Sequence, residues 1–228
     1  MLSKASIVLL AAMLLLAGCH APKDSAAANA DHRKISPDDL KFETTEDPPL
    51  KAKTHFAAGQ LAESQGDYKT AIEQYWTAVK IDGKYKDALF RLGIVYCHLQ
   101  HYPDAIVAWK EYLKATGGDA TGYSNLGFCH ELAGQQAKAE ESYRKGIAKD
   151  PTNNPCRVNY GLMLARENRL AEATLQLQVV LTPAEIHYNF ASIYEHEGRM
   201  NQARVEYRKA LDADPSFADA EIRLSMLK

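Results

Sequence analysis

Residues 120–153 read ATGYSNLGFCHELAGQQAKAEESYRKGIAKDPTN and contain the pattern that decides the fold. Two stretches of this segment place apolar side chains at i, i+3 and i+4, a spacing typical of an amphipathic helix. Gly134 separates the two stretches, and glycine tolerates the left-handed backbone conformation that ends a helix. The second stretch stops at Asp150-Pro151, because proline disfavours a helical conformation in the residue before it. The segment therefore predicts two antiparallel helices joined by a tight turn.

The same hairpin recurs along the chain. A glycine recurs every 34 residues and an alanine follows it after twelve; these are Gly59, Gly93, Gly127 and Gly161, with Ala71, Ala105, Ala139 and Ala173. The next pair, Ala191 and Ala203, has the same separation of twelve residues, but it comes 30 residues after the preceding pair instead of 34. We expect these small side chains to face each other, so that the two helices of a hairpin approach closely. The turns are predicted at Gly66, Gln100, Gly134, Asn168 and Gly198.

The letters around these ladders resemble the tetratricopeptide repeat, with its pattern W-x2-L-G-x2-Y…A-x3-F…P over 34 residues. Three units match this pattern best. The second unit matches at Leu92-Gly93, Tyr96 and Trp109, and the third unit matches at Leu126-Gly127 and Tyr143. The fifth unit matches at Phe190-Ala191, Tyr194 and Tyr207. The resemblance implies an all-α, right-handed superhelical solenoid with a C-terminal capping helix. The predicted domain is 52–228, with repeats 52–85, 86–119, 120–153, 154–183 and 184–217 and a cap helix at 218–228.

The fourth repeat is about one helical turn short. The segment Thr182-Pro183-Ala184-Glu185 supplies a threonine N-cap, a proline at the first helical position and a glutamate three residues after the cap. The chain should therefore pass from one helix into the next almost without a loop. We expect the fifth repeat to dock about a turn (~5 Å) closer than a regular unit, which interrupts the superhelix there.

The N-terminal residues 1–18 resemble the signal peptide of a bacterial lipoprotein. Lys4 precedes an apolar stretch that would measure roughly 21 Å as a helix, too short for the ~30 Å core of a bilayer. The stretch ends in Leu16-Ala17-Gly18-Cys19, which looks like a lipobox. The resemblance implies that Cys19 carries the lipid, with acyl chains such as palmitate. The alternative is an ordinary secretory signal that happens to end in cysteine.

The same resemblance suggests a location in the cell envelope. The residue after the lipobox cysteine is His20 and not aspartate, which implies the outer membrane, facing the periplasm, in a Gram-negative source. Residues 19–51 are rich in Ala, Asp, Lys and Pro and have no apolar period, so we expect a disordered tether after the lipidated cysteine. The repeats would then stay near the membrane without lying on it.

The composition and the motifs argue against several function classes. The net charge is −2 and no block of like charges occurs, so we expect no nucleic-acid partner. The sequence has no phosphate-binding loop and no H-E-x-x-H motif. We therefore predict a non-catalytic protein with no cofactor, no metal and no small-molecule substrate, which contacts the membrane only through its lipid anchor.

The cysteines leave three interpretations open. Several cysteines and histidines are predicted late in the first helices of neighbouring repeats: Cys97, His98, His101, Cys129 and His130. They could pack as small buried side chains, form a disulfide between the two cysteines, or hold a metal ion. We favour packing, because the two cysteines sit at different heights on their helices. Cys156 has no partner evident from the sequence.

The first helices of the repeats are predicted to line a concave groove that binds an extended or helical protein segment. Two sets of apolar side chains would form a ribbon across it: Phe56, Phe90, Val158 and Tyr188, three residues before the repeating Gly or Ala, and Ile94, Phe128 and Leu162, directly after it. The alternative is that some of them pack between repeats.

Asn125, Asn159 and Asn189 stand two residues before the repeating Gly or Ala. They resemble the asparagine ladder of O-linked N-acetylglucosamine transferases, in which amides hold an extended peptide backbone. An amide both donates and accepts, so it matches a peptide unit. The alternative is that they are ordinary residues of a tetratricopeptide repeat. Ala57 and Arg91 interrupt the series in the first two repeats.

These observations together predict a membrane-anchored scaffold for another envelope protein. The chain resembles repeat lipoproteins of the TadD and PilF types, which implies a role in pilus or secretion-system assembly. It equally resembles the NlpI type, which implies docking of envelope proteases or peptidoglycan hydrolases. A third alternative is an accessory subunit of a glycosyltransferase.

Overall fold

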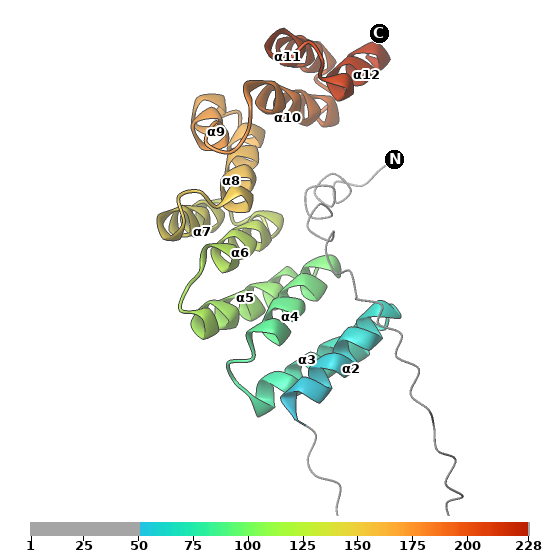
Figure 1. The fold of residues 1–228 in the computed structure, drawn as a ribbon, viewed down its shortest axis with the longest axis vertical. Coiled ribbons are helices and arrows are strands. Elements are labelled where there is room, and N and C mark those ends of the chain that lie inside the picture. Colours follow the sequence, from blue (N-terminus) through green and yellow to red (C-terminus); the bar gives the residue numbers. More distant parts are fainter. Residues whose placement is uncertain (1–50, 228) are drawn as a thin grey trace, which may run out of the picture. The chain divides into compact units, whose positions relative to one another are not determined.

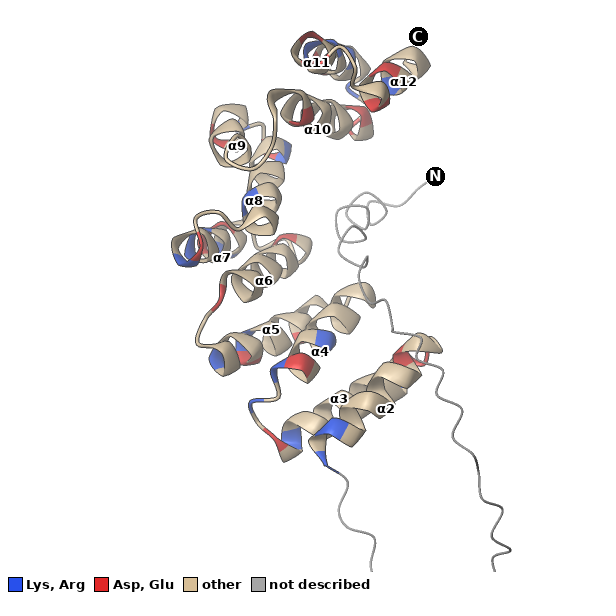
Figure 2. Cartoon of the chain, viewed as in Figure 1, with Lys and Arg blue, Asp and Glu red and all other residues tan. Residues whose placement is uncertain are grey.

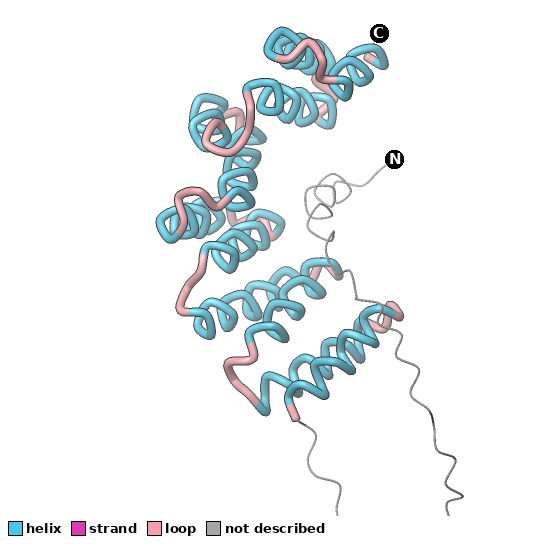
Figure 3. Tube along the Cα trace, viewed as in Figure 1, coloured by secondary structure: helices cyan, strands magenta, loops and turns pink. Residues whose placement is uncertain are grey.

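The computed structural model describes residues 51–227, and this part of the chain is helical, without strands (Figures 1 and 3). The predicted signal peptide, the predicted lipid site Cys19 and nearly all of the predicted tether lie outside the described residues. The helices are α2 (Ala52–Ser64), α3 (Tyr68–Ile81), α4 (Lys86–His98), α5 (Tyr102–Thr116), α6 (Ala120–Leu132), α7 (Gln136–Lys149), α8 (Asn154–Arg166), α9 (Leu170–Leu177), α10 (Pro183–His196), α11 (Met200–Ala213) and α12 (Ala218–Met226). The predicted all-α solenoid of helix–turn–helix repeats is confirmed.

The turn inside each repeat depends on one residue with a positive φ angle. These residues are the five predicted from the sequence: Gly66, Gly134 and Gly198, with φ between 71° and 77°, and Gln100 and Asn168, with φ of 61°. The amide that follows each of them donates to a carbonyl five residues earlier, as His101 N does to Tyr96 O at 2.8 Å. Each first helix therefore ends in a hydrogen-bonded cap before the chain reverses.

Close packing within a repeat involves the repeating glycine, whose nearest neighbour is a large side chain. The expected alanine is also close at Gly161, where Ala173 O would lie 3.3 Å from a Cβ atom. A Cβ atom on Gly59 would lie 2.5 Å from Cε1 of Tyr75, and Gly127 and Gly161 stand in the same relation to Tyr143 and Leu177. The glycine therefore makes room for the large side chain four residues after the alanine. The alanines lie in the core, with none of their surface exposed.

The hydrophobic core runs along the stack as three clusters. The first cluster extends from Ala52 to Cys129, the second from Ala139 to Phe190, and the third from Ala191 to Ala220. In the third cluster, α12 buries Ala220 completely, and the partly buried Leu224 and Leu227 pack against it. The capping helix thus covers the last apolar side of α11.

The junction between the fourth and fifth repeats is irregular, as its shortened sequence predicts. At regular junctions the second helix of one repeat packs on the first helix of the next, as α3 does on α4 and α5 on α6. Here α9 is only eight residues long, and α10 packs on α8 instead. The predicted capping box is present, with Thr182 Oγ1 accepting from Glu185 N at 3.3 Å. Leu175 and Val179 remain at least half exposed beside this junction.

Within the described residues, no helix is both long enough and apolar enough to span a bilayer. Positive and negative side chains alternate along the helices without a block of one sign (Figure 2).

Candidate protein-binding surface

The candidate site is the surface formed by the first helices of the repeats, α2, α4, α6, α8 and α10, which we call the first-helix face. Three successive helices of this face carry the apolar side chains that directly follow the repeating glycine. Ile94 on α4 is 36% exposed, and Phe128 on α6 and Leu162 on α8 are half-buried. None of the three belongs to a core cluster. This row therefore lies outside the core clusters, and Ile94 is its most exposed member.

The other predicted apolar row takes part in the packing of the core. Phe56, Phe90, Val158 and Tyr188 are partly buried and pack against the core clusters. Phe56 has its ring centroid 5.7 Å from that of Tyr75 in its own repeat and 5.3 Å from that of Tyr85, the residue that caps the next repeat. Tyr188 contacts Tyr207 and the capping residue Phe217 in the same way. Phe56 and Tyr188 therefore pack at the ends of their repeats, beside the residues that cap α4 and α12.

The three asparagines lie partly exposed on consecutive first helices, and each has one amide hydrogen bond inside the protein. Asn125 Nδ2 donates to Thr121 O at 3.0 Å, and Asn189 Nδ2 donates to Glu185 O at 2.8 Å. Asn159 Nδ2 donates to Ser124 Oγ of the preceding repeat at 3.3 Å. An asparagine amide has a second N–H and an acceptor oxygen. Each side chain therefore keeps hydrogen-bonding capacity for a partner while its orientation is held.

The cysteines of the second and third repeats differ from the prediction. Cys97 on α4 and Cys129 on α6 form a disulfide, with their Cα atoms 6.7 Å apart. Our preference for simple packing was therefore wrong, because the neighbouring helices bring the two side chains together despite their different heights. No group of three metal-binding side chains occurs among residues 51–227.

Cys156 remains a buried thiol. It donates to Tyr143 O at 3.3 Å. Burial raises its pKa to about 11. A thiol with such a pKa is a poor nucleophile, so Cys156 has a packing role and not a reactive one.

Sequence reasoning missed a set of carboxylates at the end of the first-helix face. Glu63, Glu131 and Glu195 each accept a hydrogen bond from the buried tyrosine twelve residues later, at 2.6, 3.2 and 2.7 Å. Each also pairs with an arginine of the next helical unit, and these partners are Arg91, Arg166 and Arg223. The signal was available, because each of these glutamates stands four residues after the repeating Gly or Ala of its repeat.

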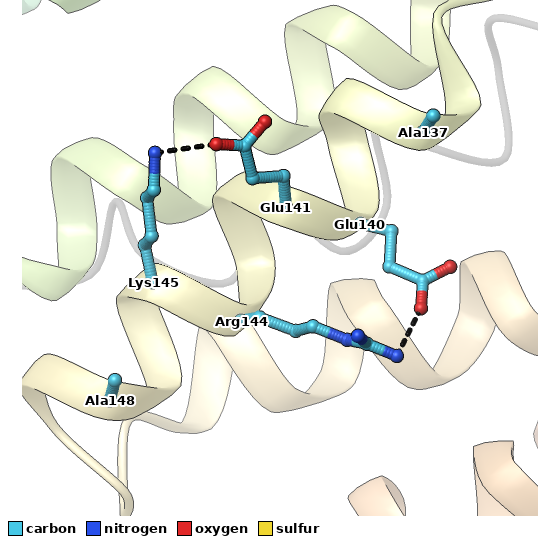
Figure 4. A pocket seen from close by; sticks show the side chains of 6 residues that line it. All are labelled: Ala137, Glu140, Glu141, Arg144, Lys145 and Ala148. Carbon is cyan, nitrogen blue, oxygen red and sulfur yellow. Dashed lines mark hydrogen bonds and ion pairs between the residues drawn. The ribbon is translucent and has the colours of Figure 1, made fainter.

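A depression on the outer side of the stack is not a good alternative site. All six residues that line it belong to α7, and its charged side chains are already paired (Figure 4). Lys145 Nζ lies 2.7 Å from Glu141 Oε1, and Arg144 Nη2 lies 2.5 Å from Glu140 Oε1. Glu140 also pairs with Arg169 of α9 at 2.8 Å. This network ties α7 to α9 and leaves no charge oriented toward a ligand.

Comparisons with known proteins support the repeat assignment. Models of the tetratricopeptide repeat match residues 59–100, 120–153 and 184–217. The chain is 28% identical over 117 residues to small glutamine-rich tetratricopeptide repeat-containing protein 2 of Mycosarcoma maydis, which is 51% of this chain and 33% of that protein. It is 32% identical over 98 residues to the BBSome complex member BBS4 of Mus musculus, 43% of this chain and 19% of that protein. The chain thus spans a third or less of the length of these two relatives.

Solved structures show the same fold. YrrB, described as a TPR protein with an unusual peptide-binding site, matches with a TM-score of 0.54 and 21% identity, over 76% of this chain and 91% of YrrB. PilF of Pseudomonas aeruginosa matches with a TM-score of 0.57 and 16% identity, over 78% of this chain and 83% of PilF. At these identities the likeness concerns the fold alone.

Proposed function

Because the chain is built of tetratricopeptide repeats, we propose that it is a non-catalytic scaffold that holds a segment of another protein on its first-helix face. The observation that supports this function is the row of Ile94, Phe128 and Leu162. These apolar side chains follow each other at the repeat period and stay outside every core cluster. An asparagine stands three residues before Phe128 and before Leu162, whereas Arg91 stands there before Ile94. A row of apolar side chains next to amide groups with free hydrogen-bonding capacity suits a peptide, which has both apolar side chains and backbone N–H and C=O groups.

The amides favour an extended segment over a helical one. The backbone groups of an α-helix already bond to each other, whereas those of an extended chain are open to Asn125, Asn159 and Asn189. The axes of packed neighbouring helices are typically about 8–10 Å apart. A polyproline II segment rises about 3.1 Å per residue, so three of its residues cover that distance. We therefore propose an extended partner segment with apolar residues at every third position.

We further propose that the scaffold is anchored in the bacterial envelope through a lipid on Cys19, most simply at the outer membrane facing the periplasm. The lipobox-like sequence supports the anchor, and two or more acyl chains hold a protein stably on a bilayer. The resemblance of the sequence to repeat lipoproteins of the TadD and PilF types makes an envelope assembly such as a pilus or secretion system the first class of partner to test. Envelope proteases and peptidoglycan hydrolases are the second class.

Site-specific photo-crosslinking in living cells tests the binding surface. A photoreactive amino acid replaces Phe128 on the first-helix face, and a second variant carries it at Glu141, which is exposed on α7. We expect one discrete crosslinked partner from position 128 and none from position 141. The crosslink should weaken when Asn125, Asn159 and Asn189 are changed to alanine in the same chain. A partner captured from position 141 but not from position 128 would place binding on the outer helices and refute the proposal.

A further inference from the structure

The residue four positions after the repeating alanine of the second helix is a buried aromatic ring with a polar group in four of the five repeats. In the first, third and fifth repeats this ring is a tyrosine whose hydroxyl donates to a glutamate twelve residues earlier. The glutamate in turn pairs with an arginine from the next helical unit. We call this Tyr–Glu–Arg arrangement the junction clamp, because it ties the core of one repeat to the surface of the next.

The first clamp shows how the arrangement works. Arg91 Nε donates to Glu63 Oε2 at 3.0 Å, and the same oxygen accepts from Tyr75 Oη at 2.6 Å. Burial lowers the pKa of Arg91, but the hydrogen bond and charge of Glu63 outweigh it, and the net pKa is raised. The arginine therefore stays charged at a half-buried place, where an ion pair is screened less than at the surface.

The second repeat lacks this clamp. Its ring is Trp109, and the residue twelve positions earlier is Cys97 instead of glutamate. The indole N–H of Trp109 is buried and has no hydrogen-bond partner among residues 51–227. A buried donor without an acceptor is destabilising, so the missing carboxylate is a loss at this junction.

The disulfide stands where the ion pair is missing. Cys97 occupies the clamp position of the second repeat and is bonded to Cys129 of the third. The fourth repeat has neither arrangement, with Leu177 and Ala165 at the two positions, and it is followed by the irregular junction. A link between neighbouring repeats at this position thus accompanies regular stacking, whether the link is ionic or covalent.

We propose that the Cys97–Cys129 bond is the covalent counterpart of the junction clamp, and that it makes the contact between the second and third repeats dependent on the redox state of the surroundings. This contact lies within the first-helix face. Ile94 is one helical turn before Cys97, and Phe128 is adjacent to Cys129. The inference does not rest on the proposed function, because it can be tested without a partner.

The bond is open to reduction from one side. Cys97 is partly exposed, whereas Cys129 is fully buried. The thiolate of a dithiol reductant would attack Cys97 Sγ, breaking the S–S bond and releasing Cys129 as a thiolate. The second thiol of the reductant then attacks the mixed disulfide and releases Cys97. Two protons and two electrons pass to the protein, and the dithiol becomes a disulfide. Buried Cys156, with its raised pKa, is a poor competitor in the exchange.

Hydrogen exchange on the full chain tests the inference. The oxidised protein is compared with protein reduced by dithiothreitol and alkylated at the free thiols. We expect exchange in residues 93–99 and 126–133 to rise by at least about tenfold on reduction, because a cross-link over a loop of this length restrains local opening. Residues 183–213 should not change. Unchanged exchange around the cysteines, or an equal rise in every helix, would overturn the proposal, as would free thiols at positions 97 and 129 in the untreated protein.

A clamp-restoring variant sharpens the test. Cys97→Glu, Leu132→Arg and Cys129→Ala together copy the pair Glu131–Arg166, whose members hold the equivalent positions in the next two repeats. We expect this variant to show slow exchange at the junction both with and without reductant. The matched variant Cys97→Ser/Cys129→Ser should exchange as fast as the reduced wild-type protein, both with and without reductant. If the triple variant does not fold, this double-serine variant tests the proposal by itself. If the double-serine variant were as well protected from hydrogen exchange as the oxidised protein, the disulfide would not act as a junction clamp and the proposal would be refuted.

Discussion

The ring of Tyr143 lies so close to Gly127 that a Cβ atom on the glycine would be 2.8 Å from the ring carbons Cδ1 and Cε1. Tyr143 is completely buried and is further held by its hydrogen bond to Glu131. Burial, with the charge of Glu131, also keeps the pKa of Tyr143 well above its usual value. The phenol thus stays a neutral donor, and its ring is held between Gly127 and the hydrogen bond to Glu131.

Gly127→Ala should therefore destabilise the protein. Overpacking in a core costs about 1–3 kcal/mol, and the better helix propensity of alanine offsets only about 1 kcal/mol of it. The control is Gly83→Ala, since a Cβ there meets nothing within 4 Å. Chemical denaturation of the two variants measures the free energies of unfolding. A Gly127→Ala variant as stable as the control would mean that the ring can shift.

The capping box at the irregular junction offers a second test. Thr182→Ala removes the acceptor for Glu185 N and leaves the first turn of α10 with an unpaired amide. We expect a loss of about 1 kcal/mol in the free energy of unfolding. Thr77→Ala is the matched control, because the Thr77 hydroxyl only bonds to a carbonyl of its own helix. Equal losses in both variants would show that the cap adds nothing at this junction.

The stability of the domain should depend on pH through His130, which is buried on α6. Burial lowers its pKa, the hydrogen bond to Gln135 opposes this, and the charges of Lys110 and Lys138 lower it further. In the unfolded chain the imidazole titrates near about 6.5. Between the folded and the unfolded pKa the unfolded chain binds more protons, so stability falls as the pH drops below about 6.5.

His130→Gln removes this contribution. We expect the melting temperature of the wild type to fall more steeply than that of the variant between pH 7.5 and pH 5.5. The comparison cancels the contribution of the other histidines. Parallel curves for the two proteins would show that His130 is equally protonated in the folded and unfolded states.

The asparagines bear most directly on function. A neutral hydrogen bond contributes about 0.5–1.5 kcal/mol, so changing Asn125, Asn159 and Asn189 to alanine should weaken binding of the crosslinked partner by roughly 1.5–4.5 kcal/mol, or about ten- to two-thousand-fold in Kd. Asn201→Ala on the exposed side of α11 is the control. Calorimetric titration measures affinity, and a melting curve of each variant measures stability. Unchanged affinity would remove the asparagines from the binding site, and a collapsed melt would assign them a structural role.

The lipid anchor can be tested independently of the fold. Cys19→Ser removes the thiol that would accept the lipid, so the chain should remain unprocessed or lose its membrane attachment. Fractionation of cells followed by a carbonate wash measures the attached fraction. A variant that still remains with the outer membrane after the wash would contradict the anchor.

The sequence by itself determined the features that depend on local chemistry. The five turn residues were predictable because only glycine, asparagine and a few polar residues adopt a positive φ readily. The capping box was predictable because its groups lie within four residues. The repeat period then fixed how the hairpins succeed each other, and with it the fold class.

Only the tertiary structure decided which side chains a neighbouring repeat covers. Phe56 and Phe128 both lie on apolar positions of first helices, yet Phe56 packs against Tyr85, the N-cap residue of α4, and Phe128 belongs to no core cluster. Cys97 and Cys129 are 32 residues apart, and their bond depends on how two helices from different repeats are placed. Periodicity gives the angle of a side chain around its own helix, whereas contact across a junction depends on the height and tilt of the next helix, which packing sets.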